Sequence, residues 1–183
     1  AEIEGGASDM LRDRAFTAAI LAGDITKAAA LAPDGPEASE ATKRLGKVVQ
    51  AVELMAVNKG KDAHALLAGD SIGFPHRGVA ALLSPWAAAM AGDREGSLVR
   101  PEMRGDRVVD YFGQLGQAYL YERARRYDEA ETDFKALTGG ETPGDIAVLA
   151  YGGFLERRGR RPEAIALYDR GLAVQPLSES LTL

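Results

Sequence analysis

The 183-residue chain contains no cysteine, two histidines and a single tryptophan. Without cysteine there can be no disulfide, no thiolate metal site and no cysteine nucleophile. His64 has two acidic neighbours in the sequence, Asp62 and Asp70. One or two histidines without an organised set of carboxylates make a poor zinc site. We therefore expect no metal and no cofactor, and we interpret His64 as a packed or solvated side chain.

The chain also lacks long apolar runs and any surplus of basic residues. It has no apolar run of about 18 residues, so no membrane-spanning helix is expected. The formal net charge is −5, whereas a general nucleic-acid binder needs a basic surplus to displace counterions. Sustained alternation of apolar and polar residues, the signal of a strand, is missing as well. The expected fold class is all-α, and nucleic acid is not an expected partner.

What the chain does contain is a short pattern that occurs twice near its end. Residues Tyr127–Ala130 (YDEA) lead to Phe134, and residues Arg161–Ala164 (RPEA) lead to Tyr168. The two alanines lie about 34 residues apart, which is the period of a stacked helix-pair repeat. In such a repeat the small residue lets two helices approach closely, and the aromatic fills the gap to the next pair.

Turn signals divide the whole chain into five helix pairs of similar length. The turns inside the pairs are expected at Gly23, Gly60, Gly92, Arg125 and Gly159. The third pair would have its second helix over Arg94–Arg100. Pro85 either starts a new helix or kinks a continuous one. Residues Thr142–Asp145 (TPGD) predict a capping box with proline at the first helical position.

These features resemble the tetratricopeptide repeat family. The fifth pair matches best, with Tyr151, Gly152, Leu155, Gly159, Ala164, Tyr168 and Pro176 at the family's large, small and proline positions. The fourth pair keeps Tyr121, Tyr127, Ala130 and Phe134, but has Gln117-Ala118 for the usual Leu-Gly. The resemblance implies a right-handed α-solenoid of about five helix pairs. It would form one domain over residues 1–183, with degenerate repeats at 8–105, clearer repeats at 106–176, and a further helix or a tail at 177–183.

The resemblance also implies a concave groove, lined by the first helix of each pair, that binds a peptide or helix of a partner protein. Carried onto this sequence, the main groove residues are Trp86, Met90, Phe112, Leu115, Tyr119, Glu122, Arg123, Glu156 and Arg157, with Leu54, Val57, Val79, Leu82 and Leu149 along the same helices. The alternative is that the apolar members are ordinary core between helices. If the groove exists, Trp86 should be only partly buried in the free protein.

Two other functions stay open. Residues 177–183 resemble the start of another helix, which favours a structural segment of a longer solenoid or a homo-oligomer built through its ends. Residues 69–73 (GDSIG) match the G-x-S-x-G string of serine hydrolases, with Ser71 as nucleophile. That motif needs a preceding strand, whereas a helix is expected here, and His76 follows too soon to complete a triad. We therefore expect a loop at this place, no catalytic residue and a non-enzymatic protein.

Arginines concentrate at the last two expected turns. The two groups are Arg123, Arg125 and Arg126, then Arg157, Arg158, Arg160 and Arg161. Stacked repeats would place both groups on one edge. This edge is either a solvated rim, supported by Glu122–Arg126 and Glu156–Arg160 pairs four residues apart, or a contact for an acidic partner or a phosphate.

The composition is rich in alanine, glycine and arginine and has a single asparagine. It is similar to that of the alanine-rich repeat proteins of alphaproteobacteria, which are often exported. A chain without cysteine suits the cytosol and the periplasm equally. The resemblance implies a bacterial source and favours the periplasm over the cytoplasm.

Overall fold

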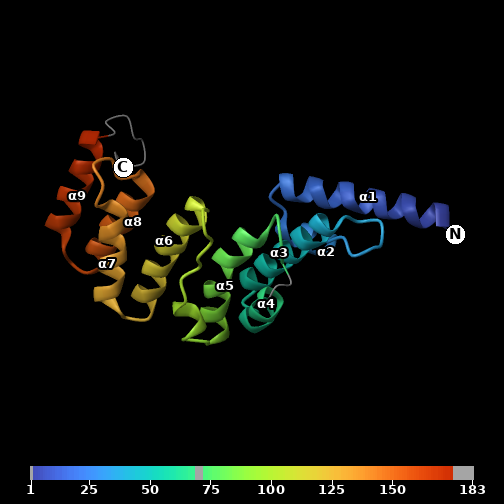
Figure 1. Ribbon diagram of the computed structural model, residues 1–183, viewed down its shortest axis with the longest axis horizontal. Coiled ribbons are helices and arrows are strands. Elements are labelled where there is room, and N and C mark those ends of the chain that lie inside the picture. Colours follow the sequence, from blue (N-terminus) through green and yellow to red (C-terminus); the bar gives the residue numbers. More distant parts are fainter. Residues whose placement is uncertain (1, 69–71, 175–183) are drawn as a thin grey trace. The chain divides into compact units, whose positions relative to one another are not determined.

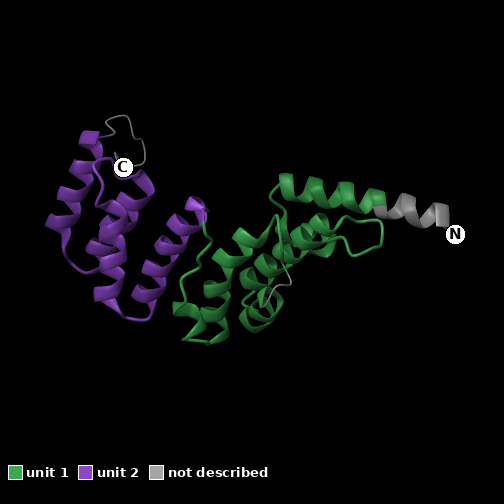
Figure 2. Cartoon of the chain, in the orientation of Figure 1, with its two compact units in different colours: residues 1–104 green, residues 105–183 purple. Residues whose placement is uncertain are grey.

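The computed structural model describes residues 2–68 and 72–174, with side chains from Met10 onward. Within these ranges the chain folds into nine α-helices, α1 to α9, and no strand occurs (Figure 1). The prediction of an all-α class is therefore confirmed. The chain divides into two compact units, Ala1–Arg104 and Gly105–Leu183, which we call unit 1 and unit 2 (Figure 2).

Unit 1 contains five α-helices and a short 3-10 helix, named here in chain order. They are α1 (Glu2–Leu21), α2 (Ile25–Ala30), α3 (Glu40–Ala56), α4 (Gly60–Leu67), α5 (Arg77–Ala91) and η2 (Gly96–Leu98). Short polar side chains begin two of them: the Asp24 carboxylate accepts the Lys27 N–H at 3.0 Å, and the Ser39 hydroxyl accepts the Thr42 N–H at 3.1 Å. Each cap satisfies a backbone donor that the helix itself leaves unpaired.

Two expectations in the third helix pair are resolved by the structure. Pro85 lies inside the continuous helix α5, so no new helix starts there. The second helix expected over Arg94–Arg100 is wrong, because only the single 3-10 turn η2 forms. The Asp93 carboxylate accepts the Gly96 N–H at 2.9 Å, which tightens the chain into this turn. Pro101 follows closely, and the residue before a proline disfavours helix.

The turns inside the helix pairs share a left-handed residue. These residues are Gly23, Asn58, Gly92, Arg125 and Gly159, with φ of 73°, 59°, 86°, 61° and 73°. Four of the five predicted turns are confirmed, and Gly60 is wrong because Asn58 takes the left-handed position. With Asn58 in place, successive turn residues lie about 34 residues apart, closer to a uniform period than predicted.

Unit 2 consists of two helix pairs. They are α6 (Arg107–Arg123) with α7 (Tyr127–Thr138), and α8 (Asp145–Arg157) with α9 (Arg161–Val174). The Asp106 carboxylate caps α6 by accepting the N–H groups of Val108 and Val109, both at 3.1 Å. The predicted capping box before α8 is wrong, because Gly144 occupies the cap position and no side chain caps this helix.

The core of unit 2 is built around the fully buried ring of Phe134. The rings of Tyr119 and Phe154 lie 5.3 Å from it, and that of Tyr151 lies 6.0 Å away. The small residues of the repeated pattern, Ala130 and Ala164, are completely buried in the same cluster. The repeat therefore places its small and aromatic residues together, where they exclude water from all four helices.

Unit 1 has two smaller clusters made mostly of alanine and branched aliphatic residues. One contains Phe16, Ala19, Ala28, Ala32 and Val49, and the other contains Val48, Ala51, Ala63, Leu67, Ile72, Ala80 and Ala87. Helices α4 and α5 approach so closely that a Cβ on Gly60 would lie 2.6 Å from the carbonyl carbon of Met90. Gly60 is thus required for close packing, and not for a turn.

Candidate functional site

Helices α6 and α8 of unit 2 lie side by side and run in the same direction. Near their starts, the Tyr111 hydroxyl interacts with the backbone N–H of Ala147, a contact that opposes the rise of the Tyr111 pKa caused by burial. Near their ends, the Glu122 carboxylate binds the Arg157 guanidinium through two hydrogen bonds of 2.8 and 2.9 Å. The two contacts align the helices along their whole length.

The side of α6 and α8 that is not covered by α7 and α9 carries exposed apolar residues. Val108 and Phe112 on α6 are 62% and 41% exposed, and Ile146 and Leu149 on α8 are 52% and 38% exposed. The spacings of four and three residues keep each pair on one helical face. We call this surface, formed by Val108, Phe112, Ile146 and Leu149, the open face.

The structure distributes the predicted groove residues of unit 2 between surface and core. Phe112, Arg123 and Glu156 are exposed, and Tyr119 is half-buried with its ring edge-on to Phe134. Leu115 is only 8% exposed and belongs to the core cluster, so it is corrected from groove to core. Its position three residues after Phe112 turns it toward the neighbouring helices.

Sequence reasoning missed two members of the open face, Val108 and Ile146. Both stand in the first turn of their helices, four residues before Phe112 and three before Leu149. The helical spacing of apolar residues is the signal that could have found them. They were missed because the family's groove pattern, which supplied the predicted residues, was not extended to the first turn.

The charged residues at the end of the open face pair between helices. Glu122 binds Arg157, Arg126 binds Glu129 at 2.7 Å, and Arg160 binds both Glu131 and Glu163 at 2.7 Å. The predicted Glu122–Arg126 and Glu156–Arg160 pairs are therefore wrong. The hydrogen bond with Glu122 raises the pKa of Arg157, which keeps this pair ionised. Glu122 and Arg157 thus act on each other and hold α6 to α8.

The predicted groove residues of unit 1, Trp86 and Met90, both lie on α5. Each is half-buried, so neither is sealed in a core. The backbone of Met90 packs against Gly60 at the start of α4, which fixes this end of α5. The indole of Trp86 therefore has the partial exposure that a groove residue requires.

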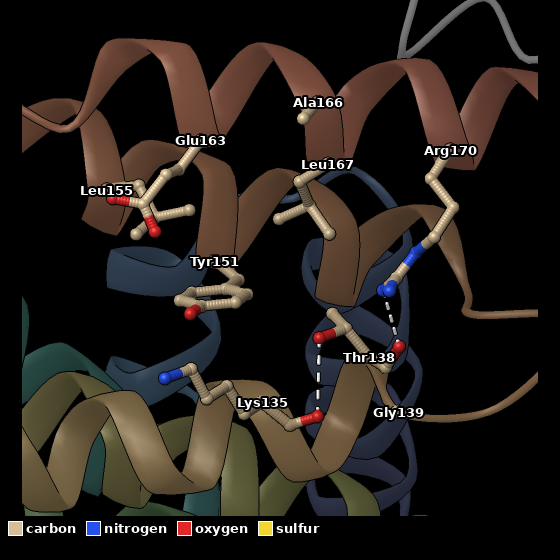
Figure 3. Close-up of a pocket in the computed structure, with 9 residues that line it drawn as sticks. All are labelled: Lys135, Thr138, Gly139, Tyr151, Leu155, Glu163, Ala166, Leu167 and Arg170. Atoms are coloured by element: carbon tan, nitrogen blue, oxygen red, sulfur yellow. Dashed lines mark hydrogen bonds between the residues drawn. The ribbon is translucent and has the colours of Figure 1, made fainter.

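A separate open pocket of about 360 Å³ lies between α7 and α9, above α8 (Figure 3). Its floor is apolar, and its lining residues are Lys135, Thr138, Gly139, Tyr151, Leu155, Glu163, Ala166, Leu167 and Arg170. In Figure 3 the Tyr151 ring and the Leu167 side chain point into the space between the two helices. At one end, Arg170 donates to the carbonyl of Thr138 at 2.7 Å.

At its other end the pocket borders a carboxylate with several donors. Glu131 accepts from Arg160 at 2.7 Å, from Lys135 at 2.8 Å and from the Tyr151 hydroxyl at 2.9 Å. The Arg160 hydrogen bond is the largest cause that lowers the pKa of Glu131 to about 2. Burial, followed by the hydrogen bond to Glu131, raises the pKa of Tyr151. These charges neutralise one another, so the network ties α7, α8 and the start of α9 together.

The predicted loop around Ser71 falls partly outside the described residues, since residues 69–71 are not described. The element before it is the helix α4, where a hydrolase motif needs a strand. His64 lies 3.6 Å from the Asp93 carboxylate, and in the described ranges no group of three or more histidines and acidic residues could hold a metal. Across the same ranges, no helix is long and apolar enough to cross a membrane. Pro176 and residues 177–183 also lie outside the description.

Comparison of the chain with protein-family models, with curated proteins and with solved structures found no match.

Proposed function

We propose that the protein is a non-enzymatic interaction module of the tetratricopeptide type, a right-handed α-solenoid that binds a segment of a partner protein. Unit 2 supports the repeat assignment, since its two helix pairs carry Ala130 and Ala164 at equivalent buried positions. The close packing of the Tyr168 ring on Gly152 is what a small-residue position in such a repeat requires. The regular spacing of the left-handed turns extends the same period through unit 1.

The observation that carries the binding function is the open face. Four large apolar side chains are exposed on two helices that two contacts hold in parallel. Contiguous exposed apolar surface on a soluble protein marks an interaction site. Rigid adjacent helices suit the apolar side of a partner helix or the alternate side chains of an extended peptide.

The experiment selects ligands from a display library of random peptides on the immobilised protein. Selected peptides are then titrated against two matched variants, Ile146→Ser and Ile165→Ser. The two isoleucines are 52% and 50% exposed, but Ile146 belongs to the open face while Ile165 lies on α9. We expect Ile146→Ser to weaken binding by about 1–2 kcal/mol, and Ile165→Ser to leave it unchanged.

The single tryptophan gives a second readout of the same experiment. Trp86 is half-buried, so its fluorescence should respond if the bound peptide reaches unit 1. Trp86→Ala should then weaken binding by about 2 kcal/mol. Equal effects of Ile146→Ser and Ile165→Ser, or a library without ligands, would refute the proposed function.

The alternative is a structural role in which the solenoid associates through its ends. It is favoured by helix α1, where Met10, Leu11 and Leu21 are 59%, 66% and 84% exposed. Such exposure invites a covering partner, which could be another copy of the chain. Light scattering over a range of concentrations tests this role, since association would raise the mean mass and Leu11→Ser would reverse it.

A further inference from the structure

The turns that join α6 to α7 and α8 to α9 lie next to each other at one edge of unit 2. Three contacts between successive helix pairs show this: Glu122 with Arg157 at 2.8 Å, Tyr127 with Arg158 at 3.8 Å, and Glu131 with Arg160 at 2.7 Å. The arginines of both turns therefore form a single surface. This surface lies at the end of α6 and α8 opposite to the open face.

The arginines of this edge fall into two groups. Arg126, Arg157 and Arg160 are engaged with carboxylates of the same chain at 2.7–2.8 Å. The other four, Arg123, Arg125, Arg158 and Arg161, are exposed, and no ion pair or hydrogen bond joins their guanidinium groups to the described residues. We call these four residues the arginine edge.

Arg158 is held ready for a ligand by stacking. Its guanidinium carbon lies 3.8 Å from the centre of the Tyr127 ring, so the ring covers one flat side of the group. The N–H donors at the rim of the guanidinium stay directed outward, because a stacked arginine keeps them in the plane of the group. Fixing the side chain before binding reduces the conformational entropy that a ligand must overcome.

Arg125 occupies a position where arginine is unfavourable for the backbone. Its φ is 61°, and the equivalent positions of the other four turns are held by Gly23, Asn58, Gly92 and Gly159. Glycine and asparagine adopt this conformation at little cost, whereas a long side chain with a Cβ does not. Backbone strain that a smaller residue would relieve is found preferentially at functional sites. Since the guanidinium of Arg125 has no partner in the described residues, folding does not explain its presence.

We propose that the arginine edge is a docking surface for an acidic peptide segment of a partner protein. Every engaged arginine in these turns already pairs with a carboxylate, so the local geometry suits guanidinium–carboxylate contacts. Two acidic side chains, Asp128 and Glu156, lie among the four free arginines and are exposed. A peptide with spaced carboxylates can avoid them, whereas a uniformly charged nucleic acid cannot.

The test measures binding of a fluorescein-labelled peptide of alternating glutamate and glycine by fluorescence anisotropy at physiological salt. A peptide with glutamine in place of glutamate controls for non-ionic contacts. The variants are Arg125→Gly, Arg161→Gln and the double variant, with Arg107→Gln as the matched control. Arg107 is an exposed arginine at the start of α6, so it changes the net charge equally without touching the edge.

We expect the glutamate peptide to bind and the glutamine peptide not to bind. Each single variant should weaken binding about threefold, and the double variant about tenfold, while Arg107→Gln leaves it unchanged. Arg125→Gly should at the same time keep or raise the melting temperature, because glycine relieves the left-handed backbone. A loss of affinity with a gain of stability separates a binding role from a structural one.

Several results would overturn the proposal. These are equal binding of both peptides, an equal effect of Arg107→Gln, or a lower melting temperature of Arg125→Gly with unchanged affinity. Tighter binding of a single-stranded oligonucleotide of equal charge would assign the edge to nucleic acid instead. The proposal does not rest on the open face: Ile146→Ser should leave binding of the glutamate peptide unchanged.

Discussion

Unit 1 and unit 2 pack their helices by different means. In the two buried clusters of unit 1, Phe16 is the one aromatic side chain, and alanines allow the helices to approach closely. In unit 2 a single cluster contains the stacked and edge-on rings of Phe134, Tyr151 and Phe154. Ion pairs between successive helix pairs then add to this core at the surface.

The difference explains why the repeat pattern is clear in one unit and weak in the other. Aromatic side chains fill large gaps that smaller residues cannot fill, so their positions are tightly constrained. Clusters of alanine and valine can be packed by many arrangements of similar volume. Unit 2 therefore keeps a readable pattern of small and aromatic residues, whereas unit 1 keeps mainly its turns.

The largest expected effect compares two fully buried phenylalanines. Phe134→Ala in unit 2 should reduce the free energy of unfolding by about 3–5 kcal/mol, the usual cost of such a cavity. Phe16→Ala in unit 1 should cost less, by about 1 kcal/mol, because Phe16 has no ring partners in its cluster. Urea denaturation followed by circular dichroism measures both. Equal losses would show that ring contacts do not distinguish the units.

Adding volume should also disturb the core of unit 2. Ala130→Phe and Ala164→Phe should each reduce the free energy of unfolding by about 1–3 kcal/mol, because both alanines are completely buried beside Phe134. Ala166→Phe is the control, since Ala166 is exposed on α9. Unchanged melting temperatures for both buried variants would mean that the repeat register is wrong.

The corresponding test in unit 1 uses its closest helix contact. Gly60→Ala should cost about 1–3 kcal/mol, because the new Cβ would meet the backbone of Met90 and force α4 away from α5. Gly152→Ala in unit 2 should cost less, because its obstacle is the Tyr168 side chain, which can rotate. Thermal unfolding of the two variants decides the order, and a reversed order would contradict this account.

One substitution in unit 2 should stabilise the protein. Gln117 is 1% exposed, and neither its amide nitrogen nor its amide oxygen has a hydrogen-bond partner. A buried polar group without a partner costs about 1–3 kcal/mol, so Gln117→Leu should raise the free energy of unfolding by about 1 kcal/mol. The neighbouring half-buried Gln114 bonds Asp133 at 3.2 Å, so Gln114→Leu should not stabilise. A destabilised Gln117→Leu variant would indicate that the amide has an unseen partner.

The smallest effect concerns the pH dependence of unit 2. Hydrogen bonds, chiefly from Arg160, lower the pKa of Glu131 from 4.5 to about 2 in the folded state. Since the folded pKa is depressed, this stabilisation is complete above pH 4.5 and is lost as the pH falls toward 2. Glu131→Gln should remove up to about 1 kcal/mol at neutral pH and flatten the acid limb of the stability curve. An unchanged acid limb would show that the ion pair contributes nothing.

Part of the candidate site could be predicted because helical spacing is a local property. The sequence placed Phe112 and Tyr119 on one side of a helix before the fold was known, and Phe112 is indeed exposed. It could not separate Leu115 from them, because burial depends on where α7 and α8 pack. The same limit applies to Glu122, whose true partner Arg157 is far away in sequence and near in space.

The sequence by itself determined the all-helical class and four of the five turn positions. Glycines at left-handed positions and apolar residues at helical spacing act over a few residues, so no knowledge of the fold is needed. Only the tertiary structure decided that Asn58 forms the second turn, because Gly60 is required against Met90. It also reduced the third pair's second helix to η2 and paired the charges of the last two turns across helices. These outcomes depend on contacts between residues distant in sequence, which local propensity does not specify.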